Sequence, residues 1–216
     1  MTRNWFICVG GFTQTRGTGN GVLALSEKLR RFQNPETNIE FLAWCDDMAA
    51  MATEIDELAK QARAIPGNEK FTPNICIFAY SYGGGYGAPR LVFELWKRGL
   101  RVRAIVLSDP VWRFKIPGLG RFGRLFEWVA APISGMTLFG KITFRPKEIG
   151  TIFWFYQRQG SFVDGFLNPQ GREPVCLGAE IHAGELLDYP HASMDDAVEW
   201  HEKCLEVAGD VLQKSS

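Results

Sequence analysis

Apolar residues in the first half of the chain form short continuous runs that alternate with segments of helical spacing. Continuous runs predict buried strands, because a parallel sheet is covered by helices on both faces. The runs are Trp5–Gly10, Ile39–Trp44, Asn74–Tyr80 and Val102–Leu107. Helical spacing predicts helices over 21–32 and 51–62 and a third that ends at Gly99. This alternation predicts an α/β fold: a mostly parallel sheet with helices on both faces.

The pattern changes after Pro110. Residues 111–150 are rich in aromatic residues, glycine and proline, and Phe122, Leu125, Phe126 and Val129 in this segment have the spacing of an amphipathic helix. We expect one domain over residues 1–216, in which 111–150 is an inserted lid or cap. Its aromatic side chains would line an acyl pocket or simply form core. They are Trp112, Phe114, Phe122, Phe126, Trp128 and Phe139.

The last third of the chain predicts both helices and short strands. Residues 149–159 predict a further helix, and 161–185 predict short strands around a turn. Ser193 followed by Asp196 resembles a capping box, so we expect the final helix to begin there.

Composition narrows the class of protein. A length of 216 residues suits one domain, and 24 basic residues balance 24 acidic ones, which argues against a nucleic-acid partner. No run of 18 apolar residues predicts a membrane span, and the N-terminus lacks the pattern of a signal peptide, so a cytoplasmic location is expected. The five cysteines form no CxxC pair and predict reduced core thiols and no metal site. The oligomeric state is not indicated.

The sharpest local motif is Ala-Tyr-Ser-Tyr-Gly, with Ser81 at its centre. An apolar strand precedes it and a helix is predicted after it, which is the context of a nucleophile elbow: a tight turn that projects the hydroxyl above the sheet edge. Small residues are needed two positions before and after Ser81, because the strand and helix backbones nearly touch there. The alternative is a glycine-rich turn whose serine only caps the helix.

A serine nucleophile needs a base, and the chain has three histidines. His191 is our first choice, because it precedes the final helix on a loop, where α/β folds present functional groups. His182 is second, and His201 is interpreted as a solvated residue within a helix.

Asp109 is the first choice for the carboxylate that would orient the histidine. It ends the strand after the one that leads to Ser81, so both residues lie at the same sheet edge. Its alternative role is that of a turn residue, and Asp164 and Asp188 remain alternative acids.

An oxyanion hole needs two backbone N–H groups directed at the developing negative charge. We expect one from Tyr82, which follows Ser81. The other is expected from Phe12 in the glycine-containing loop after the first strand, with Gly11 as the alternative.

Taken together, the Gly10-Gly11-Phe12 loop, the Ser81 turn, Asp109 before Pro110 and the late His191 resemble the α/β-hydrolase superfamily. The resemblance spans most of the chain in the order Ser, Asp, His. It implies hydrolysis of a small-molecule carboxylic ester or thioester through a Ser-His-Asp triad and an acyl-enzyme, without a cofactor. Two features depart from the family: the sheet is short at its N-terminus, and the acid more often follows one strand later.

Two other functions remain open. The segment Gly17-Thr18-Gly19-Asn20-Gly21 resembles the glycine loop of a nucleotide-binding, Rossmann-like oxidoreductase, although its spacing and its distance from the first strand depart from that motif. The chain could also be a catalytically inactive binding protein with a hydrolase fold, since fold alone does not determine function.

Overall fold

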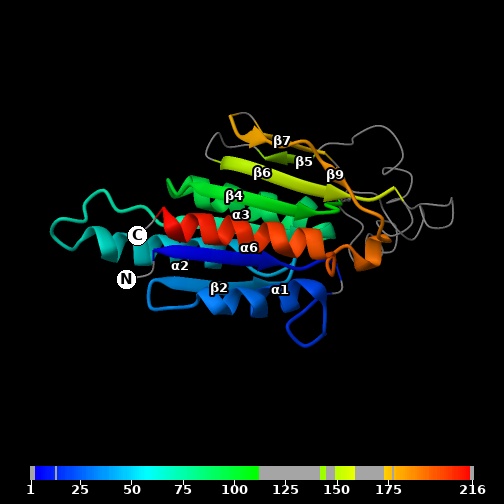
Figure 1. Cartoon of the computed structure of the whole chain (residues 1–216). Coiled ribbons are helices and arrows are strands. Elements are labelled where there is room, and N and C mark those ends of the chain that lie inside the picture. The colour runs from blue at the N-terminus through cyan, green and yellow to red at the C-terminus, as the bar shows by residue number, and fades with distance from the viewer. Residues whose placement is uncertain are drawn as a thin grey trace, which may run out of the picture.

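A seven-stranded sheet forms the centre of the protein (Figure 1). The computed structural model describes residues 3–12, 14–111, 142–144, 149–158, 173–176 and 178–214. The main strands are β1 (Asn4–Val9), β2 (Thr37–Leu42), β3 (Asn74–Tyr80), β4 (Val102–Ser108) and β6 (Ile149–Tyr156). Short strands β8 (Glu180–Ile181) and β9 (Glu185–Leu186) pair with β6, and β5 (Ile142–Phe144) pairs with β7 (Pro174–Cys176) in a second small sheet.

The strand order is β2-β1-β3-β4-β6-β8, and all of these pairings are parallel. The predicted mostly parallel sheet is therefore confirmed. The chain moves from β1 to β2 on one side, then returns to place β3 on the other side of β1. Loops leaving β1 and β3 consequently diverge at the carboxyl edge, and such a divergence is where parallel sheets form their binding crevices.

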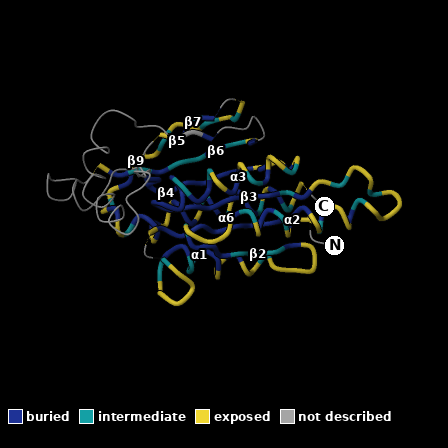
Figure 2. The backbone as a smooth tube through the Cα atoms, turned by 180° about the vertical axis from the view of Figure 1, so that it is seen from behind, coloured by how far each residue is buried: buried dark blue, intermediate teal, exposed yellow. Residues whose placement is uncertain are grey.

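Two helical layers cover the sheet. The helices are α1 (Gly21–Leu29), α2 (Met48–Arg63), α3 (Ala88–Lys97) and α6 (Val198–Gln213), with single turns η1 (Arg30–Phe32) and η3 (His191–Ser193) and a π-helical segment η2 (Gly83–Gly87). Alternation along β1 assigns its side chains to opposite faces. Trp5 and Ile7 pack with α2 and α3, whereas Phe6 and Cys8 pack with α1 and α6. Figure 2 shows the central strands β3 and β4 as buried, whereas β9 at the edge of the sheet is exposed.

Two element predictions are wrong. Residues predicted as a helix over 149–159 form β6, which pairs with β4 over its whole length. Its apolar residues are β-branched or aromatic and suit a strand, and the open edge of β4 supplied the partner that a local pattern cannot reveal. The final helix begins at Val198, not at Ser193, and Ser193 lies in η3 instead.

The cysteines largely follow expectation. Cys8, Cys76, Cys176 and Cys204 are buried free thiols. Cys45, which lies in an apolar run of the sequence, is exposed because that run ends at β2 and Cys45 belongs to the following turn. Burial raises the pKa of Cys76 to about 12, so this thiol stays protonated and packs as an apolar group.

Most of the predicted insertion over 111–150 lies outside the described residues, as do the aromatic side chains proposed for an acyl pocket. Whether it forms a lid therefore remains a prediction. Within the part of the chain that the structure describes, no helix combines the length and apolar character needed to cross a bilayer.

Candidate active site

Ser81 lies directly after β3, where the backbone turns sharply into a helical segment. Its φ angle is 51°, in the left-handed region that non-glycine residues rarely adopt. Among the described residues, Asp109, with φ of 40°, is the one other non-glycine residue with positive φ. Strained backbone of this kind persists where the surrounding structure enforces it, often at functional sites.

Close packing explains the small residues around this turn. A Cβ atom added to Gly83 would lie 2.4 Å from the Gly10 carbonyl oxygen and 2.5 Å from that of Val9. The start of η2 therefore lies against the end of β1. Any larger residue at position 83 would separate the Ser81 turn from the loop after β1.

His191 lies between Ser81 and Asp109. Its Nε2 atom is 2.8 Å from Ser81 Oγ, and its Nδ1 atom hydrogen-bonds to Asp109 Oδ2. All three side chains are buried, Asp109 completely. Residues separated by up to 110 positions in the sequence thus form one continuous chain of hydrogen bonds.

The carboxylate of Asp109 is fixed by β6. The backbone N–H of Asp109 donates to the Phe155 carbonyl at 2.8 Å, and the side-chain amide of Gln157 donates to Asp109 Oδ2 at 3.2 Å. The backbone N–H of Gln157 reaches Asp109 Oδ1 at 3.4 Å. Phe155 of β6 and Gln157, which follows this strand, therefore supply the groups that hold this aspartate.

The residues just before Ser81 and Asp109 hold the His191 segment. The Tyr80 hydroxyl donates to the His191 carbonyl oxygen, and its ring stacks on the imidazole with centroids 5.3 Å apart. Burial, with nearby carboxylates, raises the pKa of Tyr80, so its hydroxyl remains a donor. Ser108 Oγ donates to the Met194 carbonyl oxygen at 2.6 Å. The ends of β3 and β4 thus fix the loop that carries the histidine.

The loop after β1 lies against the Ser81 turn. A Cβ atom added to Gly11 would be 3.2 Å from Ser81 Cβ. The N–H of Gly11 donates to Gln14 Oε1 at 2.8 Å and is therefore already engaged, and the role of Phe12 as the upstream oxyanion donor stays a prediction. The rings of Phe12 and Trp44 stack with centroids 5.5 Å apart, and the buried Tyr82 ring packs edge-on against Trp44 at 4.8 Å.

The remaining candidates lie elsewhere. His182 is exposed and stacks on Phe153, and Asp188 is exposed on the loop before His191. Asp164 lies outside the described residues. His201 was expected to be solvated but is only 3% exposed, because α6 turns this face toward α1. Burial and the adjacent Lys28 ammonium lower the pKa of His201.

Two N–H groups at the start of α1, where a phosphate would bind, are already engaged. The Gly21 N–H donates to Asp195 Oδ2 and the Leu23 N–H to the capping oxygen of Asn20, both at 2.8 Å. In a dinucleotide site these first-turn donors would face the pyrophosphate. The nucleotide-binding alternative therefore loses its main support.

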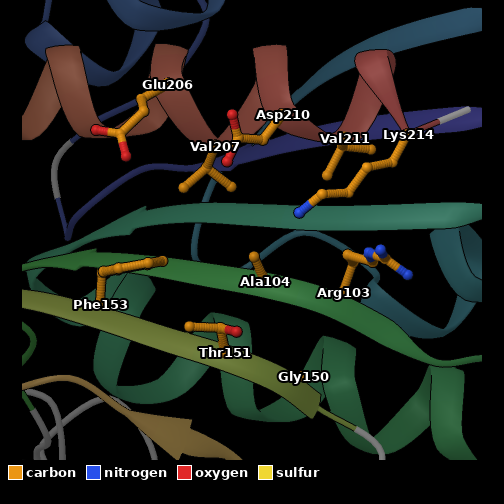
Figure 3. Close-up of a pocket in the computed structure, with 10 residues that line it drawn as sticks. All are labelled: Arg103, Ala104, Gly150, Thr151, Phe153, Glu206, Val207, Asp210, Val211 and Lys214. Atoms are coloured by element: carbon orange, nitrogen blue, oxygen red, sulfur yellow. The ribbon is translucent and has the colours of Figure 1, made fainter.

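A pocket of about 310 Å³ lies between α6 and the first halves of β4 and β6 (Figure 3). Its charged lining residues are Arg103, Lys214, Glu206 and Asp210. Arg103 stands near the start of β4 and Asp109 follows its end, which separates them by about 20 Å at the rise of a strand. The pocket is therefore at the opposite end of the sheet from Ser81.

Sequence patterns did not reveal several residues that shape this site. Tyr80 and Ser108 were interpreted only as strand residues, and Gln14, Gln157 and Asp195 had no assigned role. One signal was available: Tyr80 and Ser108 are polar residues that end apolar strands next to Ser81 and Asp109.

No protein-family model matches the chain, and no curated protein does. Solved structures that are similar to the chain include the following three. The first is from a study of LipS and LipT, two metagenome-derived lipolytic enzymes; the match covers 97% of this chain and 94% of that chain, at 12% identity and a TM-score of 0.49. The match to the RedJ thioesterase of Streptomyces coelicolor covers 96% of this chain and 85% of that chain, at 11% identity and a TM-score of 0.46. The match to ClbQ of the colibactin pathway covers 100% of both chains, at 13% identity and a TM-score of 0.40.

Likenesses this distant add nothing to the argument for function, which rests on this chain's own geometry. The chain does have the features that its resemblance to the α/β-hydrolase superfamily requires: a parallel sheet between two helical layers, with Ser81 on a strained strand-to-helix turn at the carboxyl edge.

Proposed function

We propose that this protein is a serine hydrolase that cleaves small-molecule carboxylic esters or thioesters through an acyl-enzyme. The observation that carries the proposal is the hydrogen-bonded chain Ser81–His191–Asp109, with Ser81 Oγ 2.8 Å from His191 Nε2. A serine hydroxyl becomes a strong nucleophile when a neighbouring base can take its proton.

In the proposed reaction, His191 Nε2 takes the proton from Ser81 Oγ as this oxygen attacks the carbonyl carbon. Asp109 keeps the proton of the neutral ring on Nδ1 and stabilises the imidazolium that forms. His191 then donates its new proton to the leaving alkoxide or thiolate. In the second half, His191 removes a proton from water as the water oxygen attacks the acyl carbon. The bond from this carbon to Ser81 Oγ then breaks, the carboxylic acid leaves, and His191 returns the proton to Ser81 Oγ.

Negative charge develops on the carbonyl oxygen during both halves. We assign its stabilisation to the backbone N–H groups of Phe12 and Tyr82, one from the loop after β1 and one from the turn after β3. The close approach of Gly11 to Ser81 supports this assignment, because it brings the loop after β1 to the nucleophile.

The first experiment compares the chain with its Ser81→Ala variant. The parent should label with a fluorophosphonate at Ser81 and hydrolyse p-nitrophenyl acetate. The variant should not label and should lose activity by about 10⁴-fold or more, as other serine hydrolases do when a triad member is removed. Thermal unfolding of both proteins verifies that the variant folds.

The proposal is wrong if the folded parent neither labels nor hydrolyses esters or thioesters, in which case the inactive binding protein is favoured. It is also wrong if Ser81→Ala keeps most of its activity. A series of p-nitrophenyl esters of increasing acyl length then defines the substrate: a maximum at short chains indicates a carboxylesterase, and one at long chains a lipase-like or thioesterase-like enzyme.

A further inference from the structure

Gln14 closes a ring of hydrogen bonds with Gly11 in the loop after β1. The backbone N–H of Gln14 donates to the Gly11 carbonyl oxygen at 3.1 Å. In the opposite direction, the Gly11 N–H donates to Gln14 Oε1 at 2.8 Å. Both polar groups of the Gly11 backbone are therefore engaged by a single residue.

This ring fixes the direction of the next N–H group. The described residues contain no cis peptide bond, and in a trans peptide the C=O and N–H groups point to opposite sides. Because Gln14 holds the Gly11 carbonyl, the Phe12 N–H of the same peptide plane is directed away from Gln14. Trp44 Nε1–H donates to the Phe12 carbonyl at 2.7 Å and fixes the following peptide as well.

The other end of Gln14 is also anchored. Its Nε2 donates to Oδ2 of Asp195, a carboxylate that is only 2% exposed. The same oxygen accepts the Gly21 N–H at 2.8 Å. A Cβ atom added to Gly21 would lie 2.1 Å from the Asp195 carbonyl oxygen, so α1 and the Asp195 segment are packed backbone to backbone.

Asp195 belongs to the same segment as His191. Tyr80 fixes the His191 carbonyl and Ser108 the Met194 carbonyl, so this segment is held by the ends of β3 and β4. Gln14 is thus a bridge between two parts of the site that are far apart in the sequence: the loop after β1 and the loop that carries the histidine.

We infer that Gln14, held by Asp195, is a positioning residue that directs the Phe12 N–H toward the oxyanion. This inference rests on the proposed function and adds to it a residue that touches neither substrate nor nucleophile. The Gln14–Asp195 contact sets where the loop after β1 stands relative to His191. Loss of the contact therefore weakens transition-state stabilisation and leaves ground-state binding largely intact.

The alternative is that Gln14 only stabilises the loop. A purely structural role would lower the unfolding temperature of a variant without a selective effect on kcat. The two roles differ in their effect on kcat relative to KM, and in the affinity for an inhibitor that forms an oxyanion.

The test uses the full chain and four variants with p-nitrophenyl acetate as substrate. Gln14→Ala removes the bridge, and Gln14→Glu keeps the size of the side chain but replaces the donor by a carboxylate that faces Asp195. Asp195→Asn is the conservative variant, because its amide oxygen can still accept both N–H groups. Gln33→Ala is the matched control, since Gln33 is exposed and lies outside the site.

We expect Gln14→Ala and Gln14→Glu to lower kcat by about 10- to 100-fold with KM changed by less than about threefold, because small displacements of catalytic groups have effects of this size. The affinity for an aryl trifluoromethyl ketone, which forms a tetrahedral oxyanion on the serine, should fall in proportion to kcat/KM. Asp195→Asn, which keeps an acceptor oxygen for Gln14, should lower kcat less than Gln14→Ala does, and Gln33→Ala should stay within about threefold of the parent.

The inference is overturned if Gln14→Ala or, should that variant not fold, the isosteric Gln14→Glu keeps kcat within about threefold of the parent. It is also overturned if KM rises as much as kcat falls, or if inhibitor affinity is unchanged. Failure of the proposed function looks different: the parent itself would then neither hydrolyse the ester nor label at Ser81.

Discussion

Two buried histidines of this protein lie beside groups of opposite charge: His191 beside a carboxylate and His201 beside an ammonium. His191 has its Nδ1 beside the Asp109 carboxylate and its Nε2 beside Ser81 Oγ. His201 has its Nδ1 2.7 Å from the Lys28 ammonium and its Nε2 2.7 Å from the Asp195 carbonyl oxygen. A carboxylate stabilises an imidazolium and an ammonium opposes it. Only the first environment suits a base that must gain and lose a proton, whereas the second holds its ring neutral.

The difference teaches that burial of a histidine does not by itself identify a catalytic base. His201 is the more deeply buried of the two, 3% exposed against 8% for His191. Its neutral ring donates from Nε2 and accepts from Lys28 at Nδ1, so both nitrogens have structural partners. His191 instead has a carboxylate on one side and a hydroxyl on the other, and it lies at the carboxyl ends of β3 and β4.

Of the changes that test this comparison, removal of the Asp109 charge beside His191 should have the strongest effect. Asp109→Asn should lower kcat for ester hydrolysis by about 10³- to 10⁴-fold, because an amide can hold the ring in the wrong tautomer and does not stabilise the imidazolium. Steady-state kinetics on a p-nitrophenyl ester measures this. Asp188→Asn is the matched control and should remain near the parent. Near-normal turnover of Asp109→Asn would instead direct the assignment of the acid to Asp164 or Asp188.

A smaller effect is expected from the contact that holds the His191 backbone. Tyr80→Phe keeps the ring that stacks on the imidazole but removes the donor to the His191 carbonyl. We expect kcat to fall by about 3- to 10-fold and the free energy of unfolding by about 1 kcal/mol, the usual net value of one hydrogen bond. Kinetics and urea unfolding measure the two quantities.

The control for Tyr80→Phe is Tyr86→Phe, whose hydroxyl contacts the exposed Arg90. It should leave both quantities almost unchanged. An unaltered kcat in Tyr80→Phe would show that the strand end does not position the histidine.

The smallest effect is a pH dependence of stability from His201. Its pKa is lowered in the folded protein, mainly by burial and then by Lys28, from an unfolded value near 6.5. The unfolded chain therefore binds more protons as the pH falls below about 6.5, so this contribution to stability is present above that pH and is lost below it.

We therefore expect the free energy of unfolding in urea to fall between pH 7.5 and pH 5.5, and to fall less in His201→Gln, which cannot be protonated. The difference between parent and variant isolates His201, because every other ionisable group is the same in both proteins. An identical pH dependence in the two proteins would contradict the lowered pKa.

The fold could be predicted from the sequence where local patterns and tertiary structure agree. Continuous apolar runs identify β1, β3 and β4, because a strand that is covered by helices on both faces carries apolar side chains at nearly every position. The pattern failed at β6. Its apolar residues fit either a helix or a strand, and the open edge of β4 decided between them. The start of α6 was misplaced because Ser193 ends a 3₁₀ turn and Asp196 lies between that turn and the helix.

The candidate site was predictable in its three central residues. Ser81 and Asp109 end neighbouring strands of one parallel sheet, and their meeting at one edge follows from topology. The supporting contacts were not predictable, because they join residues up to 181 positions apart, as Gln14 and Asp195 are. No periodicity in a sequence encodes such a pair.

The sequence by itself determined the alternation of strands and helices, the turn at Ser81 and the order in which the three candidate residues occur. These depend on local properties: side-chain size, apolar spacing and the conformations that small residues allow. Tertiary structure alone decided which histidine lies beside a carboxylate and which beside an ammonium, and how the loop after β1 is fastened to the loop of His191. The physical reason is that charge pairing and hydrogen bonding depend on distance in space, which only the packing of the sheet and its helices sets.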